Sequence, residues 1–129
     1  MGFTRTEGIC LRTIDYSETS QILRFLTRDH GRVTCIAKGS KRKKTAFHGT
    51  FDLLQMCELI RIEKETGALD ILTQAETLRS FNRLRSDFGR FSVACYAVEF
   101  VDEFTQDGLP VPELYLALLS TLERLEEGT

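Results

Sequence analysis

A basic tract at residues 38–44 carries the residue types best suited to ligand chemistry in this chain. It reads Lys-Gly-Ser-Lys-Arg-Lys-Lys, and residues 30–51 contain no Asp or Glu. Lysine and arginine displace counterions from nucleic-acid phosphates, so such a tract is typical of a phosphate-binding surface. A solvated charge run without function stays open as the alternative. The candidates in the tract are Lys38, Lys41, Arg42, Lys43 and Lys44.

Two aromatic residues lie near the tract. Phe47, in the same polar loop Gly39–Thr50, or Phe51, just after that loop, offers a ring on which a nucleic-acid base can stack. For Phe51 a place in the hydrophobic core is the favoured alternative.

The tract also resembles part of a nucleotide-binding phosphate loop, because Gly39 precedes the pair Lys44-Thr45. Lys44 stands one position too early, where the motif requires its second glycine. No helical pattern opens after Thr45. Without that glycine and a helix N-terminus the backbone cannot wrap a β-phosphate, so we reject nucleoside triphosphate binding.

Catalytic patterns are weak. His30 and His48 have no Ser, Cys or carboxylate at the spacing of a catalytic dyad. Glu99, Asp102 and Glu103 share one predicted helix without a Glu-x-x-His motif, which favours a solvated helix face over a metal site. An enzyme is therefore the least favoured class.

The four cysteines are widely spaced and form no Cys-x-x-Cys pair. Neither histidine stands at zinc-finger spacing from a cysteine pair, so the sequence predicts no zinc site in this chain. Each cysteine has apolar neighbours, which indicates reduced core thiols. These residues are Cys10, Cys35, Cys57 and Cys95.

The elements that must position the tract follow from hydrophobic periodicity. In the first eighty residues, alternation of apolar and polar residues predicts strands, and Gly31 supplies the positive φ of a hairpin turn. The second and third strands are expected to form one hairpin, and the fourth and fifth another. The predicted strands are Thr6–Ile14, Gln21–Thr27, Arg32–Lys38, Phe51–Ile62 and Ala68–Leu78.

After Arg79 the apolar spacing changes to three and four residues, which predicts helices near residues 86–105 and 112–126. Ser86 or Asp87 is the expected N-cap of the first. Strands followed by helices indicate an α+β fold. We expect a five-stranded oligonucleotide-binding (OB) barrel followed by an α-helical segment, with domains at residues 1–80 and 81–129.

The 129 residues have a formal net charge of −2, but the charge is unevenly distributed. Residues 1–50 contain 10 Lys and Arg against 4 Asp and Glu, whereas residues 51–129 contain 7 against 15. This asymmetry favours a nucleic-acid site in the first part of the chain. No apolar run approaches the roughly 18 residues of a membrane span, and no signal-peptide pattern opens the chain, so we expect a cytoplasmic protein without a membrane partner.

Several strings, in order along the chain, resemble the bacterial DNA repair protein RecO family. They are Thr6–Arg12 (TEGICLR), Tyr16–Leu23 (YSETSQIL), Thr27–Arg32 (TRDHGR), Ala37–Arg42 (AKGSKR), Leu72–Leu78 (LTQAETL), Leu84–Asp87 (LRSD) and Tyr96–Glu99 (YAVE).

The resemblance implies an N-terminal OB-fold, the start of a helical domain and a recombination mediator of the RecF pathway at the bacterial nucleoid. It implies binding of single- and double-stranded DNA, strand annealing, and work with RecR and the single-stranded-DNA-binding protein to load the RecA recombinase. It places Lys38, Lys41 and Arg42 on the DNA-binding surface, with Arg12, Arg24 and Arg32 as weaker candidates. The family's Cys-rich zinc site would lie beyond residue 129, so we expect no cofactor in this segment and a chain truncated before that site.

Two other function classes remain open. A protein-interaction module would dock a partner on the barrel and the acidic helices, leaving the basic tract solvated. An OB-type RNA-binding protein would use the same tract on RNA.

Overall fold

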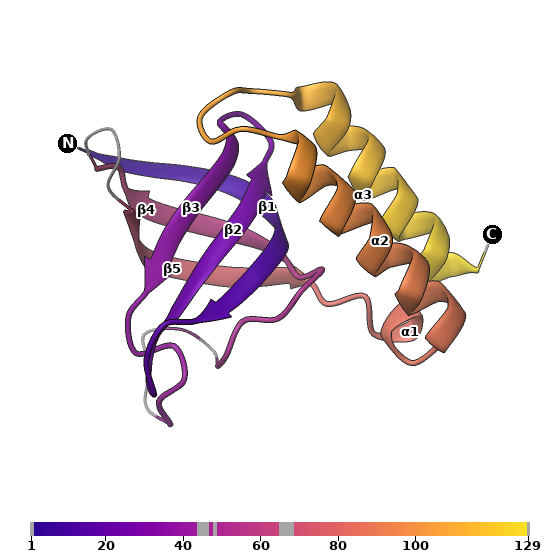
Figure 1. Cartoon of the computed structure of the whole chain (residues 1–129), viewed down its shortest axis with the longest axis horizontal. Coiled ribbons are helices and arrows are strands. Elements are labelled where there is room, and N and C mark those ends of the chain that lie inside the picture. Colours follow the sequence, from indigo (N-terminus) through magenta and orange to yellow (C-terminus); the bar gives the residue numbers. More distant parts are fainter. Residues whose placement is uncertain (1, 44–46, 48, 65–68, 129) are drawn as a thin grey trace.

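Five strands form a closed barrel in the order β1-β2-β3-β5-β4. The computed structural model describes residues 2–43, 47, 49–64 and 69–128. Every neighbouring pair is antiparallel except β3 and β5, which run parallel. The expected OB-like barrel followed by helices is confirmed (Figure 1). The strands are β1 Phe3–Asp15, β2 Gln21–Thr27, β3 Gly31–Ala37, β4 Met56–Ile62 and β5 Asp70–Arg79.

The β2–β3 hairpin follows from local chemistry. Gly31 has φ of 69°, as the sequence predicts for this turn. The Thr27 hydroxyl accepts a hydrogen bond from the His30 backbone N–H (3.0 Å) and donates one to the Gly31 carbonyl (2.6 Å). The turn is thus closed by the side chain of a buried threonine.

β1 departs from the predicted alternation at a β-bulge between Cys10 and Arg12. Ile9 and Leu11 pack toward the helices and Cys10 lies inside the barrel, as simple alternation predicts. Beyond the bulge the register changes, so Arg12 pairs with Arg24 and its side chain is exposed. An extra residue in one strand shifts every later side chain to the other face.

The prediction of a strand starting at Phe51 is wrong, because β4 begins at Met56. Leu54 has φ of 73°, which no extended strand allows. Its backbone N–H donates to the Cys10 carbonyl (3.0 Å), and its side chain is fully buried. Burial of this leucine offsets the strain of its backbone.

Three helices follow the barrel: α1 Asn82–Arg85, α2 Phe88–Phe104 and α3 Pro112–Glu127. The two longer helices confirm the prediction, and the Asp87 side chain caps α2 by accepting from the Arg90 N–H (3.1 Å). α1 was not predicted, since a single turn is too short to show a helical period. Figure 1 shows α2 and α3 side by side against one side of the barrel.

The helices pack on the barrel through a core of their own. Ile9, Leu11 and Leu26 of the barrel belong to one hydrophobic cluster with Val98 and Tyr115 of the helices. The Tyr115 hydroxyl lies 3.1 Å from Glu7 Oε1 on β1, so the ring is anchored at its polar end as well.

The outward face of α2 carries exposed apolar residues, among them Tyr96, Phe100 and Phe104. The rings of Phe100 and Phe104 lie 4.7 Å apart on this face. Among the described residues, no helix is long and apolar enough to cross a membrane.

Candidate nucleic-acid interface

The basic loop, residues 38–43, leaves the barrel at the end of β3. Figure 1 shows this end opposite the α2–α3 connection, next to the turn between β1 and β2. The Lys41 N–H donates to the Thr19 carbonyl (3.0 Å), and the Gly39 N–H donates to Ser20 Oγ (3.1 Å). The loop is therefore attached to the β1–β2 turn.

Gln21 fixes the root of the loop from inside the barrel. Its buried amide donates to the Phe51 carbonyl (3.1 Å) and accepts from the Phe51 N–H (3.0 Å). The Ser40 hydroxyl donates to the same Gln21 oxygen (2.9 Å). A buried amide satisfied in this way holds two chain segments in one geometry. Sequence reasoning missed this role, because Gln21 reads only as the first residue of a strand.

The cations of the loop are not equivalent. Lys38, Arg42 and Lys43 are exposed, and within the part of the chain that the structure describes no carboxylate pairs with them. Lys41 is half-buried, with Nζ 3.2 Å from Asp15 Oδ2. Lys44, the last candidate of the tract, lies outside the described residues.

Arg24 and Arg32 lie elsewhere, under the end of α2. Arg24 Nη2 is 2.7 Å from Asp102 Oδ2, and Arg32 Nε is 2.8 Å from Asp107 Oδ1. Thr34 donates to the other oxygen of Asp107 (2.9 Å). These arginines join β2 and β3 to the helices, whereas the sequence offered them as weaker DNA-binding candidates.

Asp102 is buried between the two arginines, so its interpretation as part of a solvated helix face is wrong. Its partners lie about seventy positions earlier in the chain, and no local pattern announces such a pairing. Arg12, the remaining candidate, is exposed on β1 beside Arg24.

The two phenylalanines near the tract are not available for base stacking. Phe47 is 5% exposed and Phe51 is 6% exposed, and their ring centroids lie 5.3 Å apart. Phe51 also meets Phe25 edge-on inside the barrel. The expectation that Phe51 belongs to the core is confirmed, and the stacking role offered for Phe47 is wrong.

Three of the cysteines, Cys10, Cys35 and Cys57, are buried free thiols inside the barrel, and Cys95 is a half-buried free thiol on α2. Burial raises the pKa of Cys35 to about 12 and that of Cys57 to about 11. Such thiols are protonated and unreactive at neutral pH. The described residues hold no group of three or more His, Cys, Asp or Glu side chains arranged to bind a metal.

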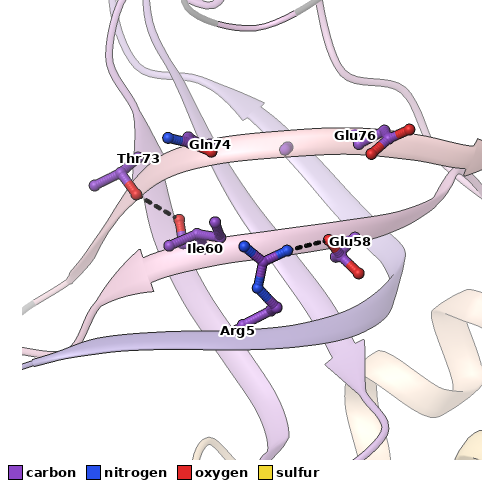
Figure 2. A pocket seen from close by; sticks show the side chains of 7 residues that line it. Arg5, Glu58, Ile60, Thr73, Gln74 and Glu76 are labelled. Carbon is purple, nitrogen blue, oxygen red and sulfur yellow. Dashed lines mark hydrogen bonds and ion pairs between the residues drawn. The ribbon is translucent and has the colours of Figure 1, made fainter.

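A hollow of about 480 Å³ lies on the outer face of β4 and β5 (Figure 2). Arg5 points across it to the Glu58 carboxylate, and Glu76 lies on the same face. Thr73 donates to the Ile60 carbonyl (2.9 Å) at its edge. Two carboxylates against one arginine disfavour a polyanion, so the basic loop remains the candidate surface.

Comparison with known families assigns the chain to a family. Residues 1–81 match the family described as recombination protein O N terminal, and residues 85–129 match recombination protein O C terminal. The chain belongs to the RecO family.

Curated RecO relatives are similar along nearly the whole chain. The DNA repair protein RecO of Syntrophobacter fumaroxidans is 37% identical over 98% of this chain and 50% of its own length. Those of Rhodopirellula baltica and Bacillus subtilis are 36% and 34% identical, over 92% and 98% of this chain. The chain spans about half the length of these RecO relatives.

Proposed function

We propose that this chain acts in DNA repair as the DNA-binding part of a recombination mediator. The basic loop contacts the phosphate backbone of single- and double-stranded DNA and reads no base sequence. Membership of the RecO family and the exposed cations at one end of the barrel support this role. The role is binding, with no bond made or broken by the chain.

The observation that carries the proposal is the exposure of Lys38, Arg42 and Lys43 on a loop whose backbone is held. The hydrogen bonds of Gln21 and Ser20 fix the loop before any ligand arrives. Binding then loses little backbone entropy, and release of counterions from phosphates provides the affinity.

The helices fit this arrangement. They contain seven of the 19 acidic residues and lie against the barrel at the side of Arg24 and Arg32, away from the basic loop (Figure 1). Acidic groups near the loop would repel a polyanion. We assign residues 1–80 to DNA binding and residues 81–129 to the start of a helical domain.

The finer role follows from the family. We propose that neutralised phosphates let two complementary strands approach, which is the physical requirement of annealing. RecR and the single-stranded-DNA-binding protein are the proposed partners in loading the recombinase, within the RecF pathway.

Replacing Lys38, Arg42 and Lys43 together by Ala tests the proposal. The slope of log affinity against log salt should flatten by about 2, because each phosphate contact on a single strand contributes about 0.7. The loss should be similar for different base sequences, since backbone contacts carry no base information. DNA titrations at several salt concentrations measure both quantities.

The matched control replaces Arg5, Arg83 and Arg124 by Ala, which removes the same formal charge away from the loop. It should leave the slope nearly unchanged. The free energy of unfolding of both triple variants should lie within about 0.5 kcal/mol per site of that of the parent, since these side chains are on the surface. Equal slopes in the loop variant and the parent would overturn the proposal.

A further inference from the structure

Among the described residues, Tyr16 is an exposed aromatic residue close to the basic loop, because it lies in the β1–β2 turn to which that loop is hydrogen-bonded. It follows β1 directly, in the turn that leads to β2, and it is 62% exposed. Among the described residues, no ring or cation packs on its ring, in contrast to Phe81 and Tyr115, which each have an arginine over the ring. An exposed tyrosine therefore stands at the end of the barrel where the loop cations lie.

The turn that carries Tyr16 has a defined conformation. The Tyr16 N–H donates to the Ser20 carbonyl (3.1 Å), and Ser17 Oγ accepts from the backbone N–H groups of Thr19 (3.3 Å) and Ser20 (3.2 Å). The same turn accepts the Lys41 N–H at Thr19. Ring and cations are thus presented by two segments that are tied to each other.

The outer face of β1 extends this surface. Ile14 is paired with Ile22, and Ile22 with Ile36, so three isoleucines cross β1, β2 and β3 in one row. Ile14 is partly exposed at 39%, two residues before Tyr16. Arg12 lies two residues further back on the same outward side of β1. Apolar surface next to a ring and flanked by cations matches a nucleotide, which has a flat base on a charged backbone.

We infer that Tyr16 is a stacking platform for an unpaired base of single-stranded DNA whose phosphates contact the basic loop. This inference rests on the proposed function and adds to it a preference for single-stranded over duplex DNA. The loop serves single strands and duplexes alike, whereas Tyr16 serves only unpaired bases. Duplex bases are already stacked on their neighbours and present no free face to the ring.

The experiment compares Tyr16→Ala, Tyr16→Phe and the parent on three DNA probes. These are an oligothymidylate of about 16 nucleotides, an abasic oligomer of equal length and a duplex of equal length. Tyr16→Ala should weaken oligothymidylate binding roughly 5- to 150-fold, the equivalent of about 1–3 kcal/mol of stacking per base. Its binding to the abasic and duplex probes should match the parent, and its salt slope should not change. Tyr16→Phe keeps the ring and should bind like the parent.

Tyr96 supplies the matched control, because it is 78% exposed but lies on α2. Tyr96→Ala should leave binding of all three probes unchanged. The sequence contains no Trp, so Tyr16→Trp and Tyr96→Trp each introduce a single reporter. Oligothymidylate should quench the fluorescence of the first and leave that of the second unchanged.

The outcomes separate the inference from the proposed function. If Tyr16→Ala binds oligothymidylate like the parent while the loop variant loses its salt dependence, the stacking role is overturned and the proposed function stands. If the parent binds none of the probes, including the abasic one, both are overturned. An equal loss on all three probes would show a structural role for Tyr16 and would also overturn the stacking role.

Discussion

The two ends of the barrel use the same kind of residue for different purposes. At the helical end, Arg24 and Arg32 are 23% and 16% exposed at their side chains and are paired with acids of α2 and its following loop. At the loop end, Lys38 and Arg42 are exposed without a described carboxylate partner. The positive charge of the first fifty residues is therefore divided between holding the fold together and meeting a ligand. Charge counted along a sequence overstates the cations that a partner can reach.

The helical end should be the more fragile of the two, and Gly31 is its tightest point. A Cβ at Gly31 would overlap the backbone of Leu109 in the α2–α3 connection, and φ is positive there. Gly31→Ala should cost about 3–4 kcal/mol, combining left-handed strain with overpacking. Urea unfolding measures the loss.

Gly108 provides the control for that change. Its φ is 78°, but an added Cβ would meet nothing within 4 Å. Gly108→Ala should therefore show only the strain of about 1–2 kcal/mol. If both variants lost the same free energy of unfolding, the overlap with the Leu109 backbone would add nothing to the cost at Gly31.

Asp102 is the next test, since it serves both arginines. Asp102→Ala leaves Arg24 and Arg32 partly buried without their common partner, which should cost about 2–3 kcal/mol, somewhat below the loss for a fully buried pair. Thermal or urea unfolding measures the change. Arg24→Ala and Arg32→Ala should likewise lower stability while leaving the salt slope of DNA binding unchanged.

Glu58→Ala is the surface counterpart, because it breaks the exposed pair with Arg5. Its cost should stay within about 1 kcal/mol. If Asp102→Ala also lost no more than about 1 kcal/mol of unfolding free energy, the ion pairs of Asp102 would contribute no more than an exposed ion pair. A flattened salt slope in Arg24→Ala or Arg32→Ala would assign these residues to the DNA interface and remove the distinction between the two ends.

Local patterns predicted the elements well. The change of period after Arg79 located the two longer helices, and the glycine at position 31 located the hairpin. What failed were features that depend on a distant partner. Leu54 adopts a positive φ because its side chain is buried between barrel and helices, and nothing within five residues of it signals this.

The residues of the candidate site also fall into those that the local sequence reveals and those that depend on a distant partner. The composition of residues 38–44 identified the loop, because a run of cations is visible in the sequence itself. The pairing of Arg24 with Asp102 joins residues 78 positions apart, so it depends on how α2 docks. Phe47 failed as a stacking residue for the same reason, since only the closed barrel shows which side of the loop its ring occupies.

Asp15 gives the smallest expected effect and the sharpest test of the loop end. Its Oδ2 lies 3.2 Å from Lys41 Nζ, and its side chain is 71% exposed. Asp15→Asn should release Lys41 for phosphate and remove one repulsive charge. We expect DNA affinity to rise about twofold at low salt, since exposed pairs are worth roughly 0.5 kcal/mol. The salt slope should steepen by up to about 0.7.

Asp29→Asn is the matched control for this change. Asp29 is an exposed acid in the β2–β3 turn, at the end of the barrel away from the loop. Both variants remove one negative charge from the same fifty residues, so a general charge effect would raise DNA affinity equally in both. Only direct competition for Lys41 predicts a rise in Asp15→Asn alone, because salt screens charges separated by more than about 10 Å. Equal rises would show that net charge, and not the geometry of the loop end, sets the affinity.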